Sequence, residues 1–270
     1  DPMRTVEDAG AGPHPKIPLP RDLYGPSRRN SMGVDLSIAA ERERLTAAIA
    51  RLDAESLEAG PVVAGRMRKD GPGAAVASPA DASRTIGRVW SAGPSDIDRA
   101  FAAAKAAQPQ WDARGGEGRA KVLRAMADAL EADRERLIAI CVREAGKTLA
   151  DAVAEVREAA DFCRYYAYLA ERQFAGRETL RGPVGETNSL SLHGRGVFVC
   201  ISPWNFPLAI FTGQVAAALA AGNGVLAKPA EQTPIVAAEA VRLFHAAGAP
   251  AELLHLLPGD GGEVGQALVA

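Results

Sequence analysis

The feature that most constrains the fold is a regular alternation of short apolar runs and helical patterns between residues 196 and 270. Strands are expected at 197–201, 225–227 and 254–257, with a helix after each. Such alternation predicts a parallel sheet with right-handed crossover helices. Because ligands of these α/β sheets bind at the carboxyl ends of the strands, a functional site is expected in the turns that follow them.

The first part of the chain carries weaker patterns. Residues 1–36 are rich in proline and glycine, which predicts an extended arm or an interdomain linker. Helices are expected at 37–57, at 118–143 and from about residue 148 onward, whereas 58–92 are predicted to form loops and an edge hairpin. Residues 177–195 contain alternating polar and apolar positions, which predicts a protruding strand.

Composition excludes several classes of protein. The 270 residues are 47% hydrophobic and carry a formal net charge of -2, so a sizeable core is expected and no electrostatic attraction to nucleic acid. The sequence contains no apolar run of roughly 20 residues, which predicts a cytoplasmic protein without a transmembrane segment. Cys141, Cys163 and Cys200 are too scattered for a disulfide framework or a metal site, and each is expected to be a buried thiol.

The first of the three turns holds Asn205 between Pro203 and Pro207. The prolines restrict the backbone on either side of an amide that carries two hydrogen-bond donors. A donor fixed at the end of a buried strand suits a developing oxyanion. A purely structural turn explains the same residues, so both interpretations stay open at this point.

The second turn begins with Lys228, directly after an apolar strand, and reaches Glu231 three residues later. In dinucleotide sites, a lysine and an acid at a strand end can both bind the adenosine ribose. A surface ion pair is the alternative interpretation.

The third turn contains Gly259, Gly261 and Gly265. Glycines allow the backbone to approach a pyrophosphate, and the N-terminus of the following helix is expected to offer free N–H groups to it. The spacing differs from the usual G-x-G-x-x-G, and a flexible loop explains three glycines equally well.

Taken together in this order, the three turns resemble those of the aldehyde dehydrogenase superfamily. The resemblance implies an α/β, Rossmann-like NAD-binding domain with a parallel sheet and flanking helices. It also implies that Asn205 contributes to an oxyanion hole and that Phe206 lines an aldehyde channel. The cofactor-binding residues that it implies are Ile201, Ser202, Pro203, Trp204, Lys228, Ala230, Glu231, Gly261, Val264 and Gly265.

Residues 21–25 together with 29–31, residues 155–166 and residues 227–234 are similar to the bacterial proline utilization A family. Its members fuse an FAD-dependent proline dehydrogenase to an NAD-dependent L-glutamate γ-semialdehyde dehydrogenase. The similarity implies oxidation of L-glutamate γ-semialdehyde to L-glutamate in proline catabolism. It makes 37–270 the NAD-binding domain, 1–36 the link to an upstream FAD-containing module, and 177–195 an oligomerisation strand in a homo-oligomer.

Glu158 stands where many members of the superfamily place an apolar residue that lines the aldehyde channel. A carboxylate there can pair with the α-ammonium group of an amino-acid aldehyde, which implies a substrate-binding role. The alternative assigns Glu158, with neighbouring Arg157 and Glu155, to a solvated helix face.

The superfamily reaction needs a cysteine nucleophile and a glutamate general base, and none of the three cysteines matches the nucleophile's motif. The 270 residues are therefore expected to be a portion of a longer polypeptide. As given, the chain is expected to bind cofactor without oxidising aldehyde. A noncatalytic nucleotide-binding or structural module derived from an aldehyde dehydrogenase is the alternative function.

Overall fold

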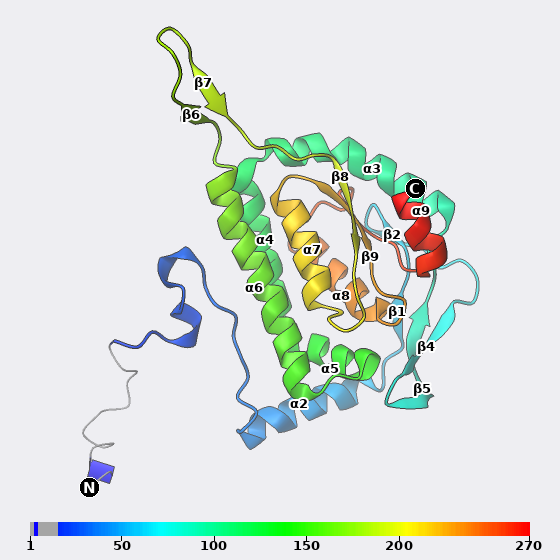
Figure 1. Ribbon diagram of the computed structural model, residues 1–270. Coiled ribbons are helices and arrows are strands. Elements are labelled where there is room, and N and C mark those ends of the chain that lie inside the picture. Colours follow the sequence, from blue (N-terminus) through cyan, green and yellow to red (C-terminus); the bar gives the residue numbers. More distant parts are fainter. Residues whose placement is uncertain (1–2, 5–15) are drawn as a thin grey trace.

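A computed structural model describes residues 3–4 and 16–270 and places a five-stranded sheet between helices (Figure 1). The strand order is β3-β2-β10-β9-β8. Strands β8, β9 and β10 are parallel, which confirms the expected α/β arrangement, and β2 and β3 continue the sheet antiparallel. These strands are β8 (Val197–Ile201), β9 (Gly224–Lys228), β10 (Leu254–Leu256), β2 (Val62–Val63) and β3 (Arg66–Met67).

Both faces of the parallel part of the sheet are covered. Every residue of β9 is buried: Val225 and Ala227 belong to the larger core cluster, and Leu226 to a smaller cluster on the opposite face. This two-sided burial explains why the strand reads as a continuous apolar run. The larger cluster includes α7 (Ala209–Ala220) and α8 (Pro234–Ala246), whereas the smaller one includes α3 (Pro94–Ala113) and η3 (Gly261–Gly265), which leads into α9 (Gln266–Val269).

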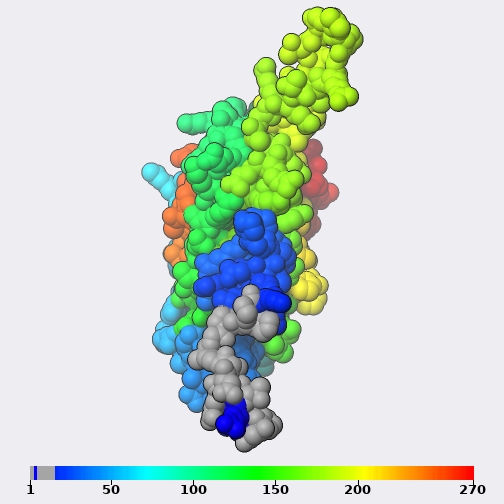
Figure 2. Space-filling model, turned by 90° about the vertical axis from the view of Figure 1, so that its left-hand side faces the viewer, coloured from blue at the N-terminus to red at the C-terminus, as the bar shows by residue number. Residues whose placement is uncertain are grey.

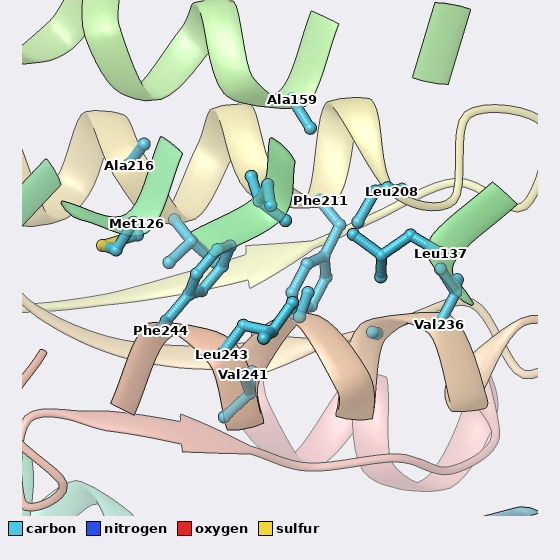
Figure 3. Packing of buried hydrophobic residues seen from close by; sticks show 14 of the residues in the cluster. Met126, Leu137, Ala159, Leu208, Phe211, Ala216, Val236, Val241, Leu243 and Phe244 are labelled. Carbon is cyan, nitrogen blue, oxygen red and sulfur yellow. The ribbon is translucent and has the colours of Figure 1, made fainter. Parts of the chain in front are cut away.

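The larger core cluster lies between α7, α8 and an outer layer of helices. Figure 3 shows Phe211 of α7 and Phe244 of α8 pointing into the same interior, with Leu208 and Leu137 nearby. Both phenylalanine side chains are fully buried. Since full burial of such a side chain contributes about 1.5–3 kcal/mol, this layer anchors the two helices that follow the first two turns.

The outer layer consists of four helices, and two of the predicted helices have different bounds. The helix expected at 37–57 ends at Leu52, and Leu57 lies in a strand instead. The single helix expected at 118–143 is divided at Asp133, whose backbone (φ -100°, ψ 19°) ends one helix and starts the next. The apolar spacing continues across this residue, so periodicity alone could not reveal the break. No helix in the described ranges is long and apolar enough to cross a membrane. The four helices are α2 (Ala39–Leu52), α4 (Gly115–Ala132), α5 (Arg134–Ala145) and α6 (Leu149–Gln173).

Residues 58–92 contain more strand than expected. Strands β4 and β5 form the antiparallel hairpin, but β5 also pairs in parallel with β1, so it lies in the middle of a three-stranded sheet. Strand β2 pairs with β10, where Val62 lies opposite Leu256. The prediction of loops was wrong here because these short strands depend on partners far away in the sequence. The three strands are β1 (Leu57–Ala59), β4 (Ala74–Ser78) and β5 (Asp81–Val89).

A hairpin protrudes from the body of the molecule (Figures 1 and 2). Its strands β6 (Glu178–Leu180) and β7 (Asn188–Leu190) are antiparallel, so the single strand predicted at 177–195 was wrong in number. The turn between them reverses the chain and lets the two short strands pair with each other. Its apolar side chains are exposed, namely Leu180, Val184, Leu190 and Leu192.

Residues 16–36 of the arm contain two short 3₁₀ turns, η1 (Pro20–Asp22) and η2 (Gly25–Ser27). It lies along the outer surface of the helical layer (Figure 2). The Ser31 N–H and hydroxyl donate to Asp161 of α6 at 2.8 and 2.7 Å, and the Met32 N–H donates to Glu131 of α4 at 2.7 Å. Residues 1–2 and 5–15 of the predicted arm lie outside the described residues.

Candidate functional site

The three turns singled out in the sequence meet at one edge of the sheet. Ile201 at the end of β8 lies opposite Lys228 at the end of β9. The Ser202 N–H donates to the Lys228 carbonyl at 3.0 Å, and the Leu257 N–H donates to the Ala227 carbonyl at 2.9 Å. These backbone bonds place the three turns side by side, so side chains from all three can reach one ligand.

The first turn presents one polar group and two aromatic rings to solvent. Asn205 is exposed, and within the described residues its side-chain amide has no hydrogen-bond partner. Trp204 and Phe206 are 60% and 41% exposed. Beneath them, the buried Ser202 hydroxyl donates to Gln214 at 3.1 Å, and the Gln214 amide donates to the Ile201 carbonyl at 3.1 Å. The turn therefore has a fixed base and an amide available to a ligand.

A buried carboxylate holds the end of this turn. One oxygen of Glu155 on α6 accepts hydrogen bonds from the Leu208 and Ala209 N–H groups, at 3.1 and 2.9 Å, at the start of α7. The other oxygen lies 3.0 Å from the Lys147 ammonium nitrogen. Both partners are shielded from water, so the pair is more than a screened surface contact. The assignment of Glu155 to a solvated face was wrong.

One sequence signal could have identified Glu155. It stands three residues after Ala152 and four before Ala159, on the same helical stripe as the buried face of α6. An acid on such a stripe needs a specific partner in the interior. Lys147, in the loop before this helix, carried no comparable signal.

Glu158 lies one turn after Glu155 and is exposed. Partial burial raises the pKa of the Glu158 carboxyl, the nearby Glu155 charge raises it further, and the Lys147 ammonium lowers it. Three of the charged groups beside the first turn therefore act on one another electrostatically.

The second turn contains a buried cation. Lys228 is 3% exposed, and its ammonium group donates to the Pro229 carbonyl at 3.2 Å. Among the described residues no carboxylate forms an ion pair with it, so the surface ion pair considered from the sequence is absent there. Ala230 is buried, and Glu231 is exposed. An ammonium in such surroundings is stabilised by oxygen acceptors that a ligand can supply.

The helix that follows the second turn is held in the same manner as α7. The carboxyl group of Glu144, at the end of α5, accepts hydrogen bonds from the Ile235 and Val236 N–H groups at 2.7 and 2.8 Å. Burial raises the pKa of Glu144 to about 8, against the opposing effect of the two donors. Side chains of α5 and α6, Glu144 and Glu155, therefore fix the helices behind both turns.

The third turn borders both charged residues of the second. Its Gly261 N–H donates to Glu231 at 3.2 Å, and a Cβ at Gly265 would lie 3.5 Å from Cε of Lys228. Asp260 accepts hydrogen bonds from the Gly262 and Glu263 N–H groups at 2.6 and 3.3 Å. The expectation of free N–H groups at this helix start was wrong because exposed carboxylates occupy them. Val264 is buried beneath the turn.

The glycines of this turn have different structural requirements. Gly259 has φ +150°, and a Cβ there would lie 2.4 Å from Cγ2 of Val264. A Cβ at Gly261 would have its nearest neighbour at 3.9 Å, from the Glu231 carboxylate. The local fold thus requires glycine at 259, whereas at 261 it leaves room for a methyl group in ordinary van der Waals contact.

All three cysteines lie in the described part of the chain and are buried. Burial raises the pKa of the Cys163 and Cys200 thiols to about 12, and it raises the pKa of Cys141 as well. Since the thiolate is the reactive form, these cysteines are unsuited to nucleophilic attack at neutral pH.

Known proteins are similar to this chain in sequence. Residues 67–270 match the family model described as the aldehyde dehydrogenase family. The chain is 46% identical over 279 residues to the bifunctional protein PutA of Escherichia coli (strain K12), with 99% of this chain and 20% of that protein covered. It is 37% identical over 236 residues to a 1-pyrroline-5-carboxylate dehydrogenase of Geobacillus kaustophilus (strain HTA426), with 87% and 46% covered. The chain thus spans about a fifth of the length of its PutA relatives.

Solved structures share the fold. Proline utilization A from Bdellovibrio bacteriovorus, inactivated by N-propargylglycine, superimposes with a TM-score of 0.88 at 33% identity, covering 97% of this chain and 27% of that one. A 1-pyrroline-5-carboxylate dehydrogenase from Thermus with bound NAD gives a TM-score of 0.85 at 31% identity, covering 95% and 48%.

Proposed function

This chain belongs to the aldehyde dehydrogenase family, and we propose that it is the cofactor-binding part of an enzyme that oxidises L-glutamate γ-semialdehyde to L-glutamate in proline catabolism. The similarity to PutA proteins over nearly the whole chain supports this assignment. In the same proposal, residues 37–270 form the NAD-binding domain, and 1–36 link it to a proline dehydrogenase module that carries FAD. The protruding hairpin, with its exposed apolar side chains, joins subunits of a homo-oligomer.

The observation that carries the cofactor assignment is the buried Lys228 ammonium, which has no carboxylate partner in the described residues and lies beside Gly265. Ribose hydroxyls would supply the oxygen acceptors that this ammonium needs, and the Glu231 carboxylate would accept from them. The missing side chain at Gly261 suits close approach of a pyrophosphate. The first-turn residues Ile201 to Trp204, together with Ala230 and Val264, complete the proposed cleft. Bound NAD would supply the hydride acceptor.

The first turn would hold the reacting aldehyde. The Asn205 amide, which has no hydrogen-bond partner among the described residues, would donate a hydrogen bond to a developing oxyanion, and the Ser202–Gln214 hydrogen bonds support the start of its turn. The Phe206 ring would exclude water from one side of the aldehyde. The Glu158 carboxylate would pair with the α-ammonium group of the substrate.

The nucleophile and general base of this reaction are proposed to come from residues outside this chain, since all three of its cysteines are buried thiols. In this proposal the chain alone binds NAD but does not oxidise aldehyde. The full-length enzyme is therefore the correct material for activity measurements.

Calorimetric titration of the full-length enzyme with NAD tests the cofactor assignment. Lys228→Met keeps the buried methylene stem and is expected to weaken NAD binding about tenfold, roughly 1.4 kcal/mol, and Glu231→Gln is expected to act in the same direction. Lys121→Met is the matched control, because Lys121 forms an exposed ion pair with Glu117. Unchanged NAD affinity in both site variants would overturn the assignment.

A further inference from the structure

Lys147 lies in the loop between α5 and α6, against the first turn. Its side chain is 16% exposed, and that of Glu155, 3.0 Å away, is 1% exposed. The same ammonium nitrogen lies 4.7 Å from the centre of the Phe206 ring. One cation therefore contacts a buried acid on α6 and an aromatic ring of the turn.

The contacts of Lys147 with Glu155 and Phe206 connect α6 to the residue next to Asn205. Glu155 is fixed by the two N–H groups at the start of α7, so it can hold Lys147 in one place. A cation within about 6 Å of a ring centroid is attracted to the ring face, and the attraction grows as water is excluded. Phe206 directly follows Asn205, so a fixed ring limits where the amide can point.

We propose that Lys147 is a positioning residue for the part of the site that binds the aldehyde. Glu155 anchors the Lys147 ammonium group, which holds the Phe206 ring and thereby positions Asn205 in the first turn. The inference rests on the proposed aldehyde oxidation. Lys147 does not touch the reacting atoms, so it acts through Phe206.

Charge balance supports this role. An uncompensated cation beside Glu158 would repel the α-ammonium group that Glu158 is proposed to bind. The charges of Glu155 and Lys147 cancel, so the negative charge of the Glu158 carboxylate remains on this side of the first turn. A lysine can therefore hold the ring without opposing the substrate.

A double-mutant cycle in the full-length enzyme tests the inference. Lys147→Met is expected to lower kcat about tenfold for L-glutamate γ-semialdehyde and for propionaldehyde, because both need the Asn205 turn, with the Kd for NAD unchanged. In a Phe206→Leu background, the same change is expected to cost less than about threefold, since the ring that Lys147 holds is gone. Lys147→Arg keeps a cation and is expected to restore most of the kcat.

Other outcomes would overturn the inference. Equal loss of kcat from Lys147→Met in both backgrounds, or an equal loss in the exposed-lysine control Lys121→Met, would show that Lys147 does not act through Phe206. The melting temperatures of the wild type, Lys147→Met, Phe206→Leu and the double variant provide a readout that needs no activity. Non-additive losses support the contact and additive losses refute it, even if the wild type oxidises neither aldehyde and the proposed function fails.

Discussion

The first two turns and the third turn are held by acidic side chains in contrasting ways. Glu155 and Glu144 are buried, and the N–H groups that they accept from lie 53–54 and 91–92 residues away in the sequence. Asp260 and Glu231 hold the third turn from the surface, and Asp260 binds its immediate neighbours. The first arrangement is part of the interior, whereas the second is open to water.

The contrast separates framework from binding surface. An anion cannot replace Glu155 or Glu144 at the starts of α7 and α8 without entering the core. At the third turn, phosphate oxygens can replace exposed carboxylates, which exchange readily with solvent. The side chains of the first two turns therefore extend from a rigid base, while the backbone N–H groups of the third turn are the ones that the proposed cofactor would reach.

Removing one buried and one exposed acidic side chain is expected to give the largest difference in the free energy of unfolding. Glu155→Ala leaves two buried N–H groups without an acceptor and Lys147 without its partner, so it is expected to lower the free energy of unfolding by about 3–5 kcal/mol. Asp260→Ala removes an exposed cap and is expected to cost about 1 kcal/mol. Urea unfolding of both variants measures the two losses. Similar losses would remove the distinction between framework and surface.

The pH dependence of stability sharpens the comparison at Glu144. Burial raises its pKa from 4.5 to about 8, so the folded protein binds a proton that the unfolded chain releases. The stability associated with this proton is complete below pH 4.5 and is lost as pH rises through 8. Between pH 6 and pH 8 the loss is expected to reach about 2 kcal/mol.

Glu144→Gln provides the control, because its side chain does not titrate. The difference in unfolding free energy between wild type and Glu144→Gln, followed by urea unfolding from pH 5 to pH 8, cancels the contributions of other groups. The wild type is expected to lose stability relative to the variant as pH rises. A constant difference across this range contradicts a raised pKa for Glu144.

Local patterns in the sequence predicted the part of the molecule that repeats regularly. Strand 197–201 was predicted with the bounds that it has, and the turns carrying Asn205, Lys228 and Gly261 lie together as the parallel order requires. The pairing of Val62 with Leu256 was not predictable, because a two-residue strand has no periodicity. Glu144 and Lys147 were missed for a related reason: their partners are brought together only by tertiary packing.

The smallest expected changes in the free energy of unfolding are those of alanine substitutions at two glycines of the third turn. Gly259→Ala is strained by its positive φ and by the contact with Val264, and is expected to cost about 1–3 kcal/mol. The methyl group of Gly261→Ala makes only an ordinary van der Waals contact, so the free energy of unfolding is expected to stay within about 0.5 kcal/mol of wild type. Its affinity for NAD is nevertheless expected to fall about tenfold, because the added methyl group lies where the pyrophosphate is proposed to approach. Thermal unfolding and NAD titration of both variants separate these effects, and undiminished NAD affinity in Gly261→Ala would place the pyrophosphate elsewhere.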